Sequence, residues 1–186
     1  MLPPIIGIHG KAHAGKSTIA EHLVQKYGYR EIAFADKLKE TLAVAFDWPL
    51  ESLYNPQFKE TVDPVYGISP RTAMQKIGTE GFRNLIDLDF WVKATMRRIQ
   101  AIRAENPDVR FVLSDIRLPN ELQAVRNAGG MAWKVVRPTD DLAPENEKHI
   151  SETALDDWHE WDAFIQNSGT LEYLKFMVDS LIKNQE

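Results

Sequence analysis

A glycine-rich segment near the amino end has the residue types and spacing that bind phosphate. Residues 7–18 read GIHGKAHAGKST, and residues 10–17 fit the pattern G-x4-G-K-[ST]. Glycines let several backbone N–H groups point into one hollow, and a helix that follows adds its own N–H groups and its positive dipole end. Because glycine loses much conformational freedom on folding, such a segment is favoured where the backbone itself is needed. The pattern predicts a loop for the phosphates of a nucleoside triphosphate.

Two side chains of this segment have predicted roles of their own. Lys16 is expected to reach the β and γ phosphates, and Ser17 is expected to ligate Mg²⁺. The remaining positions are expected to bind phosphate through their backbone: Gly10, Lys11, Ala12, His13, Ala14, Gly15 and Thr18. His13 is needed only for its backbone, and His9 is expected to be packed. The alternative interpretation is a glycine-rich turn that binds no ligand.

An aspartate and an arginine follow the apolar run at 109–113. The stretch VRFVL at 109–113 predicts a strand, and the sequence SDIR comes directly after it. Asp115 at a strand end near the loop is expected to hold Mg²⁺ through water, although a capping or turn aspartate is the alternative. Arg117 is expected either to serve the phosphates or to pair with Glu121 on the next helix.

A second group of polar residues suits a phosphate acceptor. Residues 69–84 read SPRTAMQKIGTEGFRN. Arg71 and Gln75 are four apart and share a helix face, and Arg83 follows within the same segment. Arginine forks match a dianionic phosphate, so these residues predict a nucleoside monophosphate site. The alternative is a solvated helix with surface ion pairs.

Three further residues are candidates for the acceptor site. Asp36 and Lys37 follow a short apolar run, and Asp36 is expected to orient the acceptor or the metal while also capping the next helix. Trp91 is a candidate for stacking on the base of a nucleotide. The other tryptophans are expected to anchor the core or loops: Trp48, Trp133, Trp158 and Trp161.

Alternating apolar segments must position these groups. Strands are predicted at 5–9, 31–35, 109–113, 131–136 and 163–166. Helices are predicted at 16–26, after Asp36, from Pro70 to about Ile77 behind the cap Ser69, at 89–105, at 119–128 and after the cap Thr170. Residues 47–67 are expected to be irregular. Strands that alternate with helices predict a parallel sheet covered on both faces, with ligands beyond the carboxyl ends of its strands.

Composition limits the classes of function. The chain has 186 residues, 44% of them hydrophobic, a formal net charge of −5 and no cysteine. The charge argues against general nucleic-acid binding, and the absence of cysteine excludes disulfides and thiolate metal sites. No apolar run approaches the roughly 18 residues of a membrane span, and the amino end lacks a signal-peptide pattern. We expect a cytoplasmic protein with small-molecule partners, as a monomer or homodimer.

The order of motifs resembles that of the phage-type deoxynucleoside monophosphate kinases of the P-loop kinase superfamily. The matching segments are GKAHAGKST, FADKLKE, SPRTAMQKIGTEGFRN, DFW at 89–91, SDIRLPNE, GGMAWKVVRP, HISE at 149–152 and IQNSGTL. They span nearly the whole chain. The phosphate loop is generic to the superfamily, whereas the PR…Q.IGTE..R and DIR..NE blocks are together much more specific.

The resemblance implies a fold and a reaction. It implies one P-loop kinase domain over 1–186, a three-layer α/β sandwich whose five-stranded parallel sheet has the order 2-3-1-4-5. Residues 47–104 would form a helical and irregular substrate-binding insert, and 138–152 a lid-like loop. ATP with Mg²⁺ would be the donor and a deoxynucleoside 5′-monophosphate the acceptor, as in nucleotide biosynthesis, in the host cytoplasm if the source is a phage.

The resemblance also assigns residues. Arg71, Gln75 and Arg83 match monophosphate-site positions, and Arg137 would lie by the donor nucleotide. The lid segment departs from the adenylate-kinase type, since its only basic or potentially basic side chains are Lys148 and His149. Charge over the transferred phosphate is therefore expected from Arg117 or Arg137.

Two other functions fit the same residues. One is a P-loop kinase for another small metabolite, such as a phosphorylated or hydroxylated acid or dephospho-coenzyme A. The other is a nucleotide-dependent switch without transfer activity; the absence of an N-K-x-D sequence argues against guanine recognition.

Overall fold

The computed structural model describes residues 2–138 and 153–184. The predicted lid-like loop, with Lys148 and His149, therefore lies outside the described residues from position 139 onward. The chain divides into two compact units, one of Met1–Ala33 with Arg98–Glu186 and one of Phe34–Arg97. Within the described part, no helix is long and apolar enough to cross a membrane.

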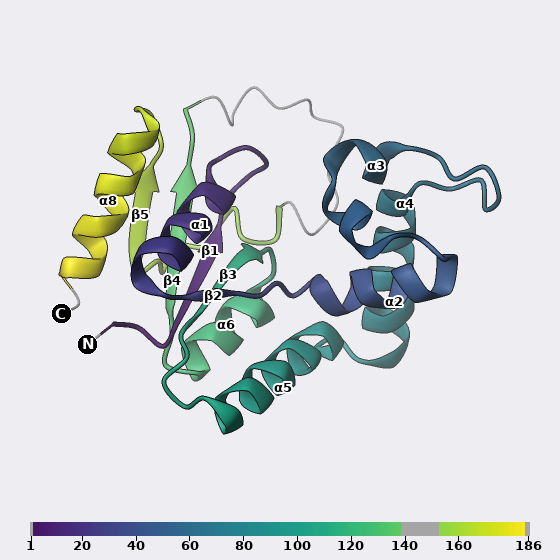
Figure 1. The fold of residues 1–186 in the computed structure, drawn as a ribbon, viewed down its shortest axis with the longest axis horizontal. Helices are drawn as coiled ribbons and strands as arrows, with labels where there is room; N and C mark the ends of the chain where they lie inside the picture. Colours follow the sequence, from purple (N-terminus) through teal and green to yellow (C-terminus); the bar gives the residue numbers. More distant parts are fainter. Residues whose placement is uncertain (1, 139–152, 185–186) are drawn as a thin grey trace. The chain divides into compact units, whose positions relative to one another are not determined.

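The first unit is built on a five-stranded parallel sheet (Figure 1). Its strands are β1 (Ile5–His9), β2 (Arg30–Glu31), β3 (Phe111–Ile116), β4 (Met131–Val136) and β5 (Ala163–Gln166). Their order is β2-β3-β1-β4-β5, which confirms the order implied by the resemblance. The central strand β1 is buried along its whole length, as its apolar sequence IIGIH requires.

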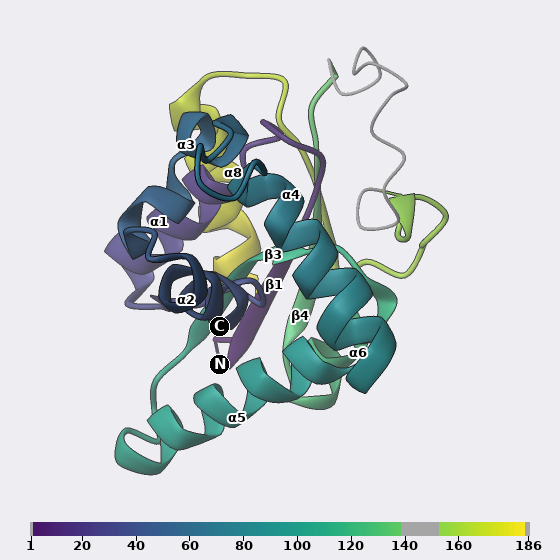
Figure 2. The same cartoon turned by 90° about the vertical axis from the view of Figure 1, so that its right-hand side faces the viewer.

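Helices cover both faces of this sheet (Figure 2). Helices α1 (Lys16–Tyr27) and α8 (Leu171–Lys183) lie on one face, and α6 (Pro119–Asn127) lies on the other. On the α1 side, Ile6 and Ile8 pack in one cluster with Ile19 and Val178. The side-chain position of Gly7 faces the opposite side of the sheet, toward α6, because side chains alternate along a strand.

A side chain at Gly7 has no room. A Cβ there would lie 2.2 Å from the Ile116 side chain and 3.2 Å from Val125 of α6. Gly7 thus allows α6 to pack closely on β1. The three layers of the unit, helices on both faces of a sheet, follow from the alternation of strands and helices along the sequence.

Two strands differ from their predicted bounds. β2 ends at Glu31 rather than at residue 35, because after the Ile32 N–H donates to the Val112 carbonyl the chain leaves the sheet. β3 begins at Phe111 rather than at residue 109, since Val109 still closes a turn onto Asn106. β3 also continues through Ile116, so that Ser114 and Asp115 lie within its last residues.

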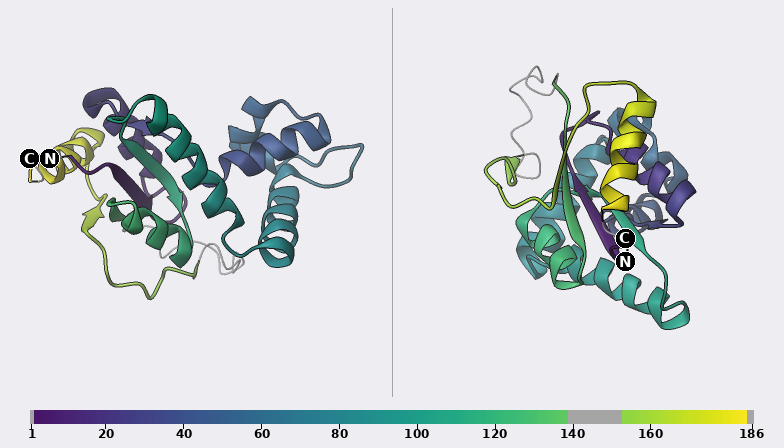
Figure 3. Two further views of the ribbon diagram at one scale, coloured as in Figure 1. Left: turned by 90° about the horizontal axis from the view of Figure 1, so that it is seen from below. Right: turned by 90° about the vertical axis from the view of Figure 1, so that its left-hand side faces the viewer.

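The second unit is helical (Figure 3). It contains α2 (Asp36–Phe46), the 3-10 helix η1 (Leu50–Tyr54), α3 (Pro56–Glu60), α4 (Pro70–Gln75) and the π-helix η2 (Lys76–Ile86). Helix α5 (Phe90–Glu105) begins in this unit and ends in the first. The core of the second unit consists of Leu38, Leu42, Trp48, Leu53 and Ala73. The prediction that 47–67 is irregular is wrong where η1 and α3 form.

The segment that carries the predicted acceptor residues is one continuous helical stretch. The Ser69 hydroxyl accepts from the Thr72 N–H, which confirms the predicted cap. The helix does not stop near Ile77 but continues in π form to Ile86, and the Asp87 N–H closes it on the Phe82 carbonyl at 3.1 Å. Such π-helical turns are frequent at functional sites.

Candidate active site

The phosphate-type loop connects β1 to α1 and has an unusual backbone. His13 and Gly15 adopt left-handed conformations, with φ of 63° and 109°. A Cβ at Gly10 would lie 2.5 Å from the Val135 carbonyl oxygen, so glycine is required there for close approach. Left-handed residues within a tight turn direct consecutive N–H groups into one concavity, the form that binds anions.

Lys16 begins α1 and folds back over the loop. Its ammonium donates to the carbonyl oxygens of Gly10 and Lys11, both at 2.7 Å. The residue that precedes α1 is Gly15, which has no side chain with which to cap the amino end of the helix. This combination of a positive helix end and a nearby ammonium fits a chain of phosphates.

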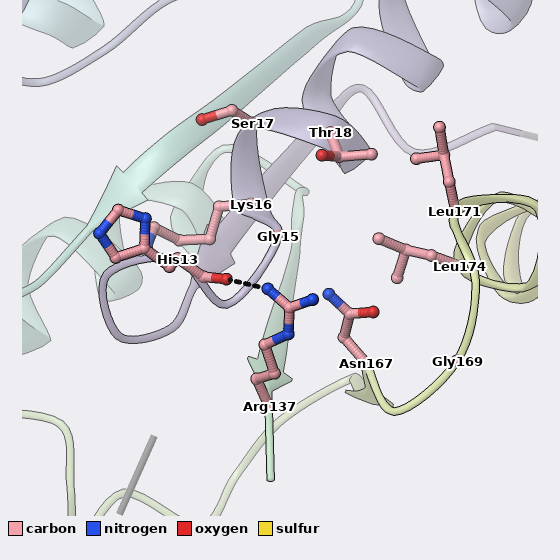
Figure 4. A pocket seen from close by; sticks show the side chains of 10 residues that line it. All are labelled: His13, Gly15, Lys16, Ser17, Thr18, Arg137, Asn167, Gly169, Leu171 and Leu174. Atoms are coloured by element: carbon pink, nitrogen blue, oxygen red, sulfur yellow. Dashed lines mark hydrogen bonds between the residues drawn. The ribbon is translucent and has the colours of Figure 1, made fainter. Parts of the chain in front are cut away.

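A cavity of about 430 Å³ opens at this loop (Figure 4). It is lined by His13, Gly15, Lys16, Ser17, Thr18, Arg137, Asn167, Gly169, Leu171 and Leu174. Cations come from the loop and the end of β4, while apolar side chains come from α8. Its volume is in the range of small-molecule sites, and its mixed lining suits a ligand with a charged and an apolar end.

Asp115 lies in a β-bulge beside the loop. Gly7 pairs with Leu113, but His9 pairs with Ile116, so β3 has one residue more than β1 between these pairs. Bulges re-aim side chains and are common next to active sites. The His9 Nδ1–H closes the bulge by donating to the Ile116 carbonyl at 2.9 Å.

His9 is buried beneath the loop, which confirms that it is packed. Burial lowers its pKa to about 4, and the positive charges of Lys134, Lys16 and Lys11 act in the same direction, against its hydrogen bond to Ile116. Its ring stacks on Trp161 with centroids 5.2 Å apart. The neutral imidazole is therefore a structural donor.

Arg137 and Arg117 lie at the ends of β4 and β3. Arg137 donates to the His13 carbonyl at 3.3 Å (Figure 4). Glu121 accepts from the backbone N–H groups of Arg117 and Leu118 at 2.7 and 3.0 Å, so its carboxylate caps the amino end of α6. Arg117 and Glu121 are thus in contact, as one of the two alternatives predicted, through the backbone N–H of Arg117.

The predicted metal ligands are a hydroxyl and a single carboxylate. Among residues 2–138 and 153–184, no cluster of three or more histidine or acidic side chains could hold a metal ion. Ser17 and Asp115 are hard oxygen donors, and Mg²⁺ takes one or two such groups beside waters and substrate phosphates. The donor set therefore fits Mg²⁺ bound together with a phosphate ligand.

The predicted acceptor residues lie in the second unit. Arg71 is paired with Glu60, and both side chains are about half exposed. Gln75 is exposed one turn further on, and Arg83 is half-buried on η2. The segment thus presents two guanidinium groups and an amide along a continuous helix.

Asp36 is placed differently from its prediction. The cap of α2 is Ala35, with no side-chain hydrogen bond, so the prediction that Asp36 caps this helix is wrong. Asp36 is instead the first helical residue, and its carboxylate accepts from the Tyr54 hydroxyl at 2.9 Å. The neighbouring Lys37 donates to Glu40 at 2.5 Å.

Trp91 is packed within the second unit. Its indole N–H donates to the Gly78 carbonyl at 2.9 Å, and its ring lies 5.1 Å from Phe82 and 4.9 Å from Phe90, centroid to centroid. Gly78 also allows close packing of this segment on α2, since a Cβ there would lie 2.6 Å from the Leu38 side chain.

Sequence reasoning missed four residues that line the cavity: Asn167, Gly169, Leu171 and Leu174. Asn167 is 8% exposed, follows β5 and donates from Nδ2 to the Ala14 carbonyl of the loop at 2.9 Å. The signal for it was present, because ligands bind beyond the carboxyl ends of parallel strands and the motif IQNSGTL stands at that point.

The structure sorts the predicted residues into two groups. The first unit carries those expected to bind the triphosphate: the loop with Lys16 and Ser17, together with Asp115, Arg117 and Arg137. The second unit carries those expected to bind the monophosphate: Asp36, Lys37, Arg71, Gln75, Arg83 and Trp91.

Comparison with known proteins points to one family. The family model for deoxynucleotide monophosphate kinase matches residues 55–178. A protein of Acanthamoeba polyphaga mimivirus described as a deoxynucleotide monophosphate kinase is 29% identical, over 97% of this chain and 96% of its own length. The deoxynucleotide monophosphate kinase of Escherichia phage RB69 is 30% identical over 62% of this chain, a match that spans 45% of the phage enzyme.

A solved structure shares the fold. Dephospho-CoA kinase from Campylobacter jejuni superposes with a TM-score of 0.53 at 14% identity, covering 98% of this chain and 96% of that one. At this identity the likeness concerns the fold alone.

Proposed function

This chain belongs to the deoxynucleotide monophosphate kinase family, and from that membership we propose how its residues share the work of phosphoryl transfer. The chain is a phosphotransferase that uses ATP to phosphorylate a deoxynucleoside monophosphate. The observation that carries the residue assignment is the loop between β1 and α1, with its left-handed backbone and its folded-back lysine. Phosphoryl transfer needs mainly positioning and neutralisation of charge, and this loop supplies both.

The first unit binds the donor. Lys16 exchanges its two loop carbonyls for the β and γ phosphates, which are stronger acceptors because they are anionic. The loop N–H groups from Gly10 to Thr18 hold the same phosphates. The apolar side chains of Leu171 and Leu174 line the part of the cavity that takes the nucleoside.

Ser17 and Asp115 would hold Mg²⁺, with the Ser17 hydroxyl as a ligand and the Asp115 carboxylate acting through water. A bound Mg²⁺ neutralises part of the phosphate charge. The bulge closed by His9 keeps Asp115 at the carboxyl edge of the sheet.

Two arginines of the first unit stabilise the charge on the transferred group. Arg137 already lies at the loop, on the His13 carbonyl, and Arg117 follows β3. A guanidinium presents a planar fork of donors to phosphate oxygens, so either residue is suited to this role.

The second unit binds the acceptor. Arg71 and Arg83 hold the 5′-phosphate, and Gln75 adds an amide on the face of Arg71. Asp36, Lys37 and Trp91 shape the part of the site nearer the nucleoside. Residues 47–104 act as the substrate-binding insert of a single kinase domain, whose partners are small molecules in the cytoplasm.

A side-by-side acceptor panel tests this function. The purified chain is mixed with ATP, Mg²⁺ and each common deoxy- or ribonucleoside monophosphate, and ADP and the diphosphate product are quantified. We expect at least one deoxynucleoside diphosphate to form in equal amount to ADP, and Lys16→Ala to abolish its formation. ADP release at the same rate with and without acceptor would contradict the proposal, because it indicates hydrolysis alone.

A further inference from the structure

We propose that Asn167 is a positioning residue that holds the phosphate loop in its anion-binding shape before ATP arrives. The proposal deepens the function above and rests on it, since it assigns ATP to this loop. Asn167 follows β5 and lies far from the loop in sequence, but its side chain lies against the last residues of the loop (Figure 4). It acts through the backbone of Ala14, not through a reacting atom.

The contact is built like a fixed part of the core. The amide Nδ2 donates to the Ala14 carbonyl at 2.9 Å in a buried environment, and the Asn167 backbone N–H donates to the Val136 carbonyl at 2.7 Å. The residue as a whole is 8% exposed. A buried carbonyl that loses its donor keeps the full cost of its desolvation, so this bond strongly favours one orientation of the Ala14 peptide.

That peptide decides where the loop N–H groups point. The Ala14 carbonyl and the Gly15 N–H belong to the same planar peptide group and face opposite ways. Fixing the carbonyl on Asn167 therefore directs the Gly15 N–H away from Asn167. Gly15 itself has φ of 109°, a conformation that glycine adopts readily and other residues rarely.

Asn167 also limits the room at Gly15. A Cβ on Gly15 would lie 2.6 Å from Asn167 Nδ2 and 3.3 Å from Leu174. Asn167 can therefore pack this closely on the loop because residue 15 is a glycine. The loop is packed as well as hydrogen-bonded from this side.

A second strand end holds the adjacent peptide. Arg137, after β4, donates to the His13 carbonyl at 3.3 Å. Two consecutive loop carbonyls are thus bound by side chains from the ends of neighbouring strands. Of these two donors, Asn167 is the neutral and buried one, so it serves the shape of the loop rather than the charge of the ligand.

The test measures binding of inorganic tripolyphosphate and of ATP by calorimetry. Tripolyphosphate has no base or sugar, so it reports on the loop alone. Asn167→Ala removes the donor without adding charge, and Asn167→Asp keeps the shape but replaces the donor with an acceptor. We expect both variants to bind both ligands at least about tenfold more weakly than the wild type, because each loses the buried hydrogen bond. Asn167→Asp is expected to bind more weakly than Asn167→Ala, because its carboxylate also repels the Ala14 carbonyl and the anionic ligand.

The matched control is Ser168→Ala, an exposed neighbour whose side chain does not line the cavity. It is expected to bind like the wild type. Affinity for the deoxynucleoside monophosphate, measured without ATP, is expected to stay unchanged in all three variants, and the KM for ATP is expected to rise more than the KM for the acceptor. These two readouts separate positioning of the loop from general damage to the fold.

Two outcomes would overturn the proposal. If Asn167→Ala weakens ATP but not tripolyphosphate, Asn167 contacts the nucleoside directly. If both variants lower the affinity for ATP and for the monophosphate equally, with a lower unfolding midpoint, Asn167 has a merely structural role. Both outcomes are distinct from failure of the proposed function, which would appear as absence of transfer by the wild type in the acceptor panel.

Discussion

Two residues that we propose to bind substrate phosphates, Lys16 and Arg71, already hold contacts that a bound substrate would have to replace. The ammonium of Lys16 lies on two loop carbonyls, and Arg71 is paired with Glu60. The Arg71–Glu60 pair is about half exposed, and exposed ion pairs contribute little free energy. A dianionic phosphate can therefore displace Glu60 from Arg71 at small cost.

Arg71→Ala is expected to raise the KM for the monophosphate by about 10- to 100-fold, because a hydrogen bond to a charged partner is worth about 1.5–3 kcal/mol. The KM for ATP is expected to change little. The control Glu60→Gln removes the same ion pair but keeps the guanidinium, so its acceptor KM should not rise. Steady-state kinetics with each substrate varied in turn check this, and unchanged acceptor kinetics in Arg71→Ala would show that the acceptor pocket is misplaced.

Local motifs made some of these residues predictable and others not. The loop residues Gly10 to Thr18 are contiguous, so their chemistry follows from spacing alone. The Asn167 contact joins residues 153 positions apart, and such pairing depends on the sheet order rather than on any local pattern. The role of Asp36 as a cap was predicted wrongly, because a capping residue type next to a helix does not fix which residue precedes the first turn.

Among the elements, α1 and α8 are tied by one carboxylate. Asp179 of α8 accepts from Lys26, His22 and Tyr27 of α1 at 2.6, 2.7 and 2.7 Å. Partial burial alone would raise the pKa of Asp179, but the three hydrogen bonds together hold it well below its usual range. This cluster fixes the helix that follows the phosphate loop against the helix that follows Asn167.

Asp179→Asn is expected to lower the free energy of unfolding by about 1–2 kcal/mol at pH 7, the size of a few charge-assisted bonds at a partly exposed site. Because the folded pKa is depressed, the stabilisation by the carboxylate is present above the unfolded value near 4 and declines as pH falls below it. Urea unfolding at pH 7, 5 and 3 measures the difference between wild type and variant, which should shrink only at pH 3.

The exposed Asp157→Asn removes an equal charge outside this cluster and serves as the control. It should leave the unfolding free energy unchanged at every pH. A difference between wild type and Asp179→Asn that is constant from pH 7 to pH 3 would contradict the assignment to the ionised carboxylate.

The sheet could be predicted more fully than the helical unit. The apolar run 5–9 is buried along its whole length, and 131–136 is buried or half-buried throughout, so their largely apolar composition marks them as strands. The short helices within 47–67 and the π-helix through Gly78 and Gly81 depend on tertiary packing, for example of Leu38 on Gly78. Propensity argues for a turn at these glycines, and packing overrides it.

At the scale of the whole molecule, the two predicted ligand sites have separate structural supports. The loop is carried by the sheet of the first unit, and the Arg71 segment by the core of the second. The chain passes between the units at Ala33–Phe34 and again at Arg97–Arg98, within α5. Each site is therefore built almost entirely from residues of one unit.

This separation predicts that each ligand alone binds independently of damage to the other site. Lys16→Ala is expected to weaken ATP binding at least about tenfold and to leave monophosphate binding within about twofold, and Arg71→Ala to do the reverse, because changes without shared partners add in free energy. Calorimetry with one ligand at a time measures both constants, and the double variant should show the sum of the single effects. Equal weakening of both ligands by Lys16→Ala would mean that the sites share a support, and the division of labour between the units would then be wrong.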